Sequence, residues 1–202
     1  MSSSSDLLRD LHNENIHLKA ENQRLLDELR HLRQSLRSLF KLQTKLDQIN
    51  PQTEPFEIIN SILATALDAV NSKDGSLMLL DEETHELVFV QVMGSAQKKL
   101  TGFRLPPGEG IASWVVNTRT PKLVIDVNAE PRFSPLVDQL TGFLTTSLIC
   151  VPVVDNRGAL GAIEVVNTTG GEPFRKDDLD IMLLVARLAS LAISRAESSA
   201  LP

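Results

Sequence analysis

Leucine recurs at every seventh position near the N-terminus, and this spacing constrains the chain more than any other feature. A stripe that narrow gives a single helix little to bury, whereas two helices wound together bury it along a shared seam. The pattern therefore predicts a dimeric coiled coil over residues 6–49. With the leucines at d, the positions expected to dimerise are Leu11, Asn15, Leu18, Asn22, Leu25, Leu29, Leu32, Leu36, Leu39 and Leu46.

Charge and polar positions favour a parallel arrangement of this coil. Asparagines at two a positions pair with their own copies across a parallel two-stranded seam, and Glu14 at g faces Lys19 at e of the partner helix. The charged residues of 30–45 are all basic, however, while those of 6–28 are mainly acidic. An antiparallel coil that matches opposite ends therefore stays open as the alternative.

Composition limits the classes of function. Removing a 50-residue coil from 202 residues leaves about 150, the size of one domain. The net charge of −6 disfavours direct binding to nucleic acid, because an acidic surface repels the phosphate backbone. The chain has neither a long apolar stretch nor an apolar signal segment at its start. We therefore expect a soluble, cytoplasmic protein that does not bind membranes.

Prolines and changes in the hydrophobic pattern divide the chain into five segments. Two prolines in the sequence NPQTEP end the coil, and beyond them short runs rich in Val, Ile and Leu alternate with amphipathic helical stretches. We expect a flexible N-terminus at 1–5, the coil at 6–49, a linker at 50–55, a domain at 56–197 and a tail at 198–202. Within the domain, strands are expected at 76–81, 87–93, 101–105, 123–127, 146–154 and 159–167, and helices at 56–70, 109–118, 132–141 and 176–195.

The expected closing helix is apolar nearly all the way round, as in the run IMLLVA at residues 181–186. A helix without a polar, solvent-exposed face is buried on two sides. We expect one side to meet the sheet and the other to meet a partner subunit. The terminal helices and the coil thus predict the same homodimer.

Several short motifs in the second half of the chain resemble the GAF domain, a sensory domain related to the PAS fold. They are residues 107–115 (PGEGIASWV), 124–127 (VIDV), 131–133 (PRF), 147–153 (SLICVPV) and 160–167 (LGAIEVVN), followed by Phe174 and residues 178–179. The resemblance implies an α+β fold. Its six-stranded antiparallel sheet has terminal helices on one face and a small-molecule pocket under helices and loops on the other.

Some GAF domains bind cyclic nucleotides through a signature that this chain matches only in part. Asn167, Phe174 and Asp178 agree with it, but Thr168 stands where the signature has lysine and Leu179 where it has glutamate. The lysine–aspartate ion pair of the signature cannot form. We therefore favour the interpretation that Asn167 ends a strand and that Asp178 begins a helix.

Five residues are the candidates for contact with a ligand, because they are polar or aromatic and fall in the region of the implied pocket. They are Asp126, Arg132, Phe133, Thr146 and Asn167. Each also has a structural interpretation: Asp126 as a strand-end cap, Arg132 as its ion-pair partner, Phe133 as core, Thr146 as a sheet residue and Asn167 as a strand end.

Catalysis and metal binding have little support in the sequence. Three of four histidines lie in the coil, tyrosine is absent, and the single cysteine, Cys150, stands in an apolar run where we expect it to be buried and inert. We expect neither an enzyme nor a metal site.

The sequence favours a homodimeric regulatory module. It would sense a small molecule, with a cyclic nucleotide among the candidates, and signal through its helices to a partner protein. The alternative is a scaffolding GAF domain without a ligand, used for dimerisation and docking.

Overall fold

The computed structural model describes residues 4–47 and 55–200. Helices and strands follow one another in the order α1 (Ser4–Asp47), α2 (Pro55–Ala69), β1 (Ser72–Leu80), β2 (Leu87–Met93), α3 (Gln97–Leu100), β3 (Arg104–Leu105), α4 (Gly110–Thr118), β4 (Lys122–Val124), the 3-10 turn η1 (Val127–Ala129), α5 (Leu136–Thr141), β5 (Leu148–Val154), β6 (Ala159–Thr168) and α6 (Lys176–Ala200).

The strands form one six-stranded sheet in the order β3-β2-β1-β6-β5-β4, and every neighbouring pair is antiparallel. Two hairpins, β1–β2 and β5–β6, meet through the pairing of β1 with β6 at the centre. Central strands need cover on both faces because their side chains are apolar on both. The expected six-stranded antiparallel sheet with flanking helices is confirmed.

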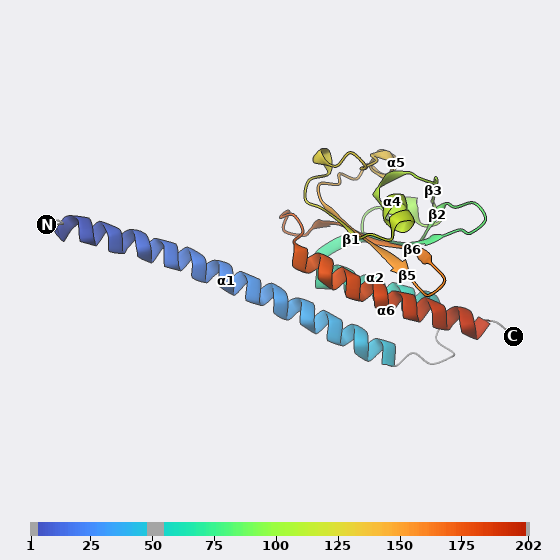
Figure 1. The fold of residues 1–202 in the computed structure, drawn as a ribbon, viewed down its shortest axis with the longest axis horizontal. Coiled ribbons are helices and arrows are strands. Elements are labelled where there is room, and N and C mark those ends of the chain that lie inside the picture. Colours follow the sequence, from blue (N-terminus) through green and yellow to red (C-terminus); the bar gives the residue numbers. More distant parts are fainter. Residues whose placement is uncertain (1–3, 48–54, 201–202) are drawn as a thin grey trace.

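Helices α2 and α6 cover one face of the sheet, which we call the packed face (Figure 1). Its core is continuous and apolar, and Leu77, Ile149, Ile163 and Val165 from the strands and Met182 from α6 are completely buried in it. Helix α1 contacts α2 and, less extensively, α6. The packed face therefore connects the sheet to the long N-terminal helix.

Helices α4 and α5 lie on the opposite face of the sheet, which we call the cavity face (Figure 1). The alternation of side chains along β6 separates the two faces, because Ala162 belongs to the core of the cavity face while Ile163 and Val165 belong to that of the packed face. A single strand thus contributes to both cores.

Helix α1 has 44 residues and extends well beyond the domain (Figure 1). Its leucine stripe is exposed in the single chain: the accessible fraction is 55% at Leu11, 50% at Leu18, 48% at Leu25 and 54% at Leu32. Of the seam positions predicted from the sequence, the side chains of Leu39 and Leu46 lie outside the described residues. None of the helices in the described ranges combines the length and apolarity needed to cross a membrane.

Several boundaries differ from those expected. The expected linker at 50–55 lies outside the described residues except for Pro55, which begins α2. Part of the expected flexible N-terminus, residues 4–5, is helical, and α6 continues through residues 198–200 of the expected tail. The helix expected at 132–141 begins only at Leu136, because Pro135 stands at its N-cap. The strand expected at 123–127 ends at Val124, since Asp126 caps η1.

Candidate functional site

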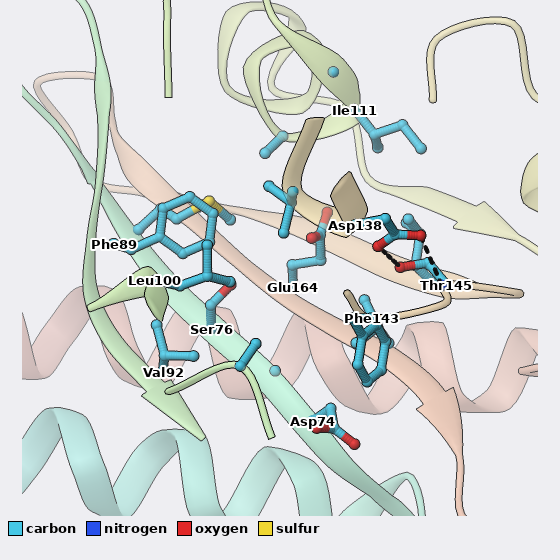
Figure 2. A pocket seen from close by; sticks show the side chains of 18 of the residues that line it. Asp74, Ser76, Phe89, Val92, Leu100, Ile111, Asp138, Phe143, Thr145 and Glu164 are labelled. Atoms are coloured by element: carbon cyan, nitrogen blue, oxygen red, sulfur yellow. Dashed lines mark hydrogen bonds between the residues drawn. The ribbon is translucent and has the colours of Figure 1, made fainter. Parts of the chain in front are cut away.

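A cavity of about 80 Å³ lies between the sheet and the elements that cover its cavity face (Figure 2). One water molecule needs about 10–15 Å³ by this measure, so the cavity has room for roughly five to eight waters or a small organic molecule. Its walls come from β1, β2, β6, α3, α4, α5 and the segments beside them. The site is therefore assembled from parts of the chain that are far apart in sequence.

Most of the cavity wall is apolar. The aromatic and aliphatic side chains that line it are Met78, Phe89, Val92, Met93, Leu100, Leu105, Ile111, Phe133, Val137, Phe143, Leu148 and Val166. Apolar walls with a few polar groups are typical of small-molecule sites. The polar groups in this wall should therefore determine which ligand is bound.

Three carboxylates, Asp74, Asp138 and Glu164, are among the polar groups of the wall. Asp74 Oδ1 accepts hydrogen bonds from the backbone N–H of Ser95 at 2.8 Å and from its hydroxyl at 3.0 Å. Asp138 accepts from the backbone N–H of Thr145 at 2.8 Å and from its hydroxyl at 2.7 Å. Both aspartates thus accept hydrogen bonds from neighbouring loops.

Glu164 occupies the middle of the sheet. Its cross-strand neighbours are Ser76 on β1 and Cys150 on β5, and these three residues form a polar row across the central strands. Figure 2 shows the Glu164 side chain near the centre of the cavity, with Asp138 of α5 close to it. Glu164 as a whole is half-buried and lines the cavity, and the surrounding protein shields its carboxyl from bulk water.

This environment changes two acid–base equilibria. Burial raises the pKa of Glu164 from 4.5 to about 7, and the negative charge of Asp138 adds to the rise, while a hydrogen bond from the Cys150 thiol opposes it. Burial likewise raises the pKa of Cys150, with Glu164 contributing. Cys150 therefore stays protonated near neutral pH and is a poor nucleophile.

The charged groups at the cavity have one sign. Among the residues that the structure describes, those lining the cavity include no lysine, arginine or histidine. The ammonium of Lys99 donates outside the lining, to the carbonyls of Leu140 and Thr141. Groups of histidine, cysteine, aspartate and glutamate able to hold a metal ion are also absent from the described part of the chain.

Of the ligand residues expected from the sequence, Phe133 lines the cavity. Asp126 caps η1, where it accepts from the backbone N–H of Asn128 at 2.9 Å. Arg132 is ion-paired with Glu130 at 3.4 Å, and its guanidinium stacks 5.0 Å from the centre of the Trp114 ring. Neither Asp126 nor Arg132 belongs to the cavity wall.

Asn167 and Thr146 are bonded to each other beside the cavity, and neither lines it. The side-chain oxygen of Asn167 accepts from the backbone N–H of Thr146 at 2.8 Å, from its hydroxyl at 2.9 Å and from the N–H of Ser147 at 3.2 Å, and its amide donates to the carbonyl of Leu144 at 2.8 Å. Asn167 therefore fastens the segment before β5 to the end of β6.

The other matches to the cyclic-nucleotide signature are also in structural positions. Phe174 is buried in the core of the packed face. The Asp178 carboxylate accepts a 2.7 Å hydrogen bond from the backbone N–H of Arg175 at the start of α6. These residues lie away from the cavity wall.

The interpretation of the sequence missed Glu164, Asp138 and Asp74. Glu164 had a detectable signal, because it is the one charged residue in β6, a strand predicted to be apolar on both faces. An ionisable group in such a strand marks a functional site more often than one on an exposed surface. The two aspartates had no comparable signal, since folding alone brings them into the same cavity wall as Glu164.

Part of the chain is similar in sequence to a curated protein. An aligned stretch of 96 residues is 31% identical to the dual 3',5'-cyclic-AMP and -GMP phosphodiesterase 11A of Takifugu rubripes, and covers 46% of this chain and 11% of that enzyme. This chain therefore corresponds to a small part of that relative.

Two solved structures share the fold at low identity. The GAF domain of a phosphoenolpyruvate-protein phosphotransferase from Coxiella burnetii superposes with a TM-score of 0.69 at 17% identity, covering 82% of this chain and 95% of that one. The free methionine-R-sulfoxide reductase of Neisseria meningitidis, solved with its substrate, gives 0.68 at 18% identity, covering 82% and 91%. The sequence profile of the GAF domain matches residues 54–193, and the chain belongs to the GAF family.

Proposed function

We propose that this protein is a homodimeric regulatory module whose GAF domain binds a small molecule in the cavity and signals through its helices to a partner protein. The observation that carries the proposal is the cavity itself, whose mostly apolar wall includes three carboxylates. GAF domains are sensory and regulatory modules, and this chain belongs to that family.

Strand β6 supplies a physical route from the cavity to the helices. Glu164 lines the cavity, while Ile163 and Val165 on either side of it are packed in the core shared with α2 and α6. A ligand that shifts β6 by a fraction of an ångström must therefore repack that core or move the helices. Since α1 contacts α2 and α6, the movement would reach the long helix.

The exposed leucine stripe of α1 supports the homodimer. Leucines at seven-residue spacing with half of their surface accessible are costly in water and are buried when two such helices pair. Light scattering at micromolar concentration should therefore find two subunits. A single subunit would contradict the homodimer and the signalling route that depends on it.

A cyclic nucleotide suits the cavity poorly, although the phosphodiesterase relative is named for such molecules. Its phosphate is an anion, and the wall offers carboxylates in place of basic side chains. Its base and sugar also exceed the space of roughly five to eight waters. We therefore propose a smaller ligand.

The alternative, a scaffolding domain without a ligand, has less support. A domain that only docks and dimerises has no use for a buried carboxylate whose desolvation costs free energy. A closed and wholly apolar cavity would have favoured it.

A metabolite panel screened by thermal shift tests the sensing role. We expect at least one compound to raise the Tm of the wild type and to lose this effect in Ala112→Leu, which fills the cavity from α4. Asn117→Leu, on the exposed side of the same helix, should respond like the wild type. Bound compound should also change hydrogen exchange in α2 and α6. A panel without any cavity-dependent shift would reject sensing.

A further inference from the structure

The three carboxylates of the cavity differ in their hydrogen bonds. Asp74 and Asp138 each accept from a backbone N–H and a hydroxyl. The donor to Glu164 in the described structure is the thiol of Cys150, which is a weak one. Glu164 therefore keeps most of its acceptor capacity free, and that capacity faces the cavity.

A buried carboxylate in this state is costly unless a donor or a cation satisfies it. The neighbouring strands supply no cation, because the residues on either side of Glu164 in the sheet register are Ser76 and Cys150, and of these the weakly donating Cys150 thiol bonds to the carboxylate. The negative charge of Asp138 acts on Glu164 and increases the cost. A positively charged donor from outside the chain would remove it.

We propose that the cavity binds a small primary amine in its protonated form, with Glu164 as counter-ion and the apolar wall around the hydrocarbon part of the amine. This inference rests on the proposed function, since it names the ligand class of the same cavity. An ammonium group brings three N–H donors, which match the free acceptor sites of a carboxylate. Phe89, Leu100, Ile111 and Phe143 supply the apolar contacts.

The same wall selects against other ligand classes. A carboxylate or phosphate ligand would be repelled by Glu164 and Asp138 and would find no basic partner among the lining residues described. A neutral alcohol could donate one hydrogen bond but would leave the charge uncompensated. Charge therefore discriminates among ligands of equal size and shape.

Three probes that share a branched carbon skeleton and differ in the charge of the polar end test this selection: isobutylamine, isobutanol and isobutyrate. Isobutylamine has roughly five non-hydrogen atoms, which suits a space of roughly five to eight waters. At pH 8 the amine is protonated and Glu164 is mostly ionised. Saturation-transfer NMR on the full chain should show binding of isobutylamine, at least tenfold weaker binding of isobutanol and none of isobutyrate.

Glu164→Gln is the decisive variant, because it keeps the shape of the side chain and removes its charge. We expect it to weaken isobutylamine at least tenfold. Glu83→Gln, an equal charge change in the exposed turn before β2, should leave the affinity unchanged. The affinity of the wild type for isobutylamine should also fall between pH 8 and pH 5.5, because Glu164 takes up a proton and loses its charge. The other ionisable groups that face Glu164 or share its cavity are Asp74, Asp138 and Cys150.

The outcomes separate this inference from the proposed function. The amine inference would be overturned if isobutanol bound as tightly as isobutylamine or more tightly, if isobutylamine did not bind, or if Glu164→Gln left the affinity unchanged. A neutral compound that binds in the cavity would then still support sensing. Isobutylamine that binds through Glu164 without changing hydrogen exchange in α2 or α6 would support the amine inference and contradict signalling.

Discussion

The two faces of the sheet use the same strands for opposite purposes. On the packed face, Ile163 and Val165 join an apolar core that α2 and α6 close completely. On the cavity face, Glu164 occupies the intervening position beside a space that the covering helices leave open. The difference indicates that one face supplies the stability that allows the other to hold a hollow and a desolvated charge.

The largest expected effect is on the packed face. Ile163→Ala should lower the free energy of unfolding by about 3–4 kcal/mol, because its side chain is completely buried and leaves a void that the core cannot refill. Ile111→Ala, the same change on the cavity wall, should cost only about 1–2 kcal/mol, since one side of Ile111 already faces empty space. Urea unfolding measures both. Equal losses would break the distinction between the faces.

The second prediction concerns the charge on the cavity face. Below pH 4.5 Glu164 is protonated in the folded and unfolded states. Between pH 4.5 and about 7 the folded state retains a proton that the unfolded state has released, so the free energy of unfolding falls as pH rises. Above about pH 7 the full penalty is present. Glu164→Gln should therefore stabilise the protein by up to about 3 kcal/mol at pH 8 and by little at pH 4.5.

Unfolding in urea at the two pH values, on wild type and Glu164→Gln, measures this difference. Glu83→Gln serves as the exposed control, and its effect should not depend on pH in this way. A Glu164→Gln variant that destabilises equally at both pH values would show that the carboxylate is compensated within the folded chain.

The smallest of these effects lies between the faces, at Asn167. Asn167→Ala removes the hydrogen bonds to residues 144–147 and places alanine at a φ of 50°, which residues other than glycine, asparagine and aspartate adopt at a cost. We expect a loss of about 1–2 kcal/mol in the free energy of unfolding. Asn167→Asp retains the acceptor oxygens and should lose less. An unchanged stability in Asn167→Ala would mean that the segment before β5 is held by other contacts.

Much of the fold follows from patterns within short windows. Residues 87–93 form a strand with the predicted bounds, because a run rich in Val and Leu there is bounded by polar residues. The helix expected at 132–141 was too long, since the effect of Pro135 on its first turns was not weighed. Likewise, Ile125 was assigned to a strand but is 64% exposed, because the chain turns at Asp126 to form η1.

The site depends on information that no short window holds. Glu164 meets Ser76 and Cys150 through the register of three strands, and Asp138 arrives from a helix that the sequence placed only approximately. Phe133 was expected at the pocket and lines it, while Asp126 and Arg132 are held by local partners. Local polarity therefore identified residues near the cavity, whereas its charged centre required the three-dimensional arrangement.

The position of Cys150 also provides the chain with an internal probe. It is the single cysteine, it is completely inaccessible, and its thiol stays protonated beside Glu164. A thiol reagent can modify it only when the sheet opens, so the labelling rate reports the frequency of that opening. Any molecule that occupies the neighbouring hollow should slow the modification without a dye or an engineered tag being attached.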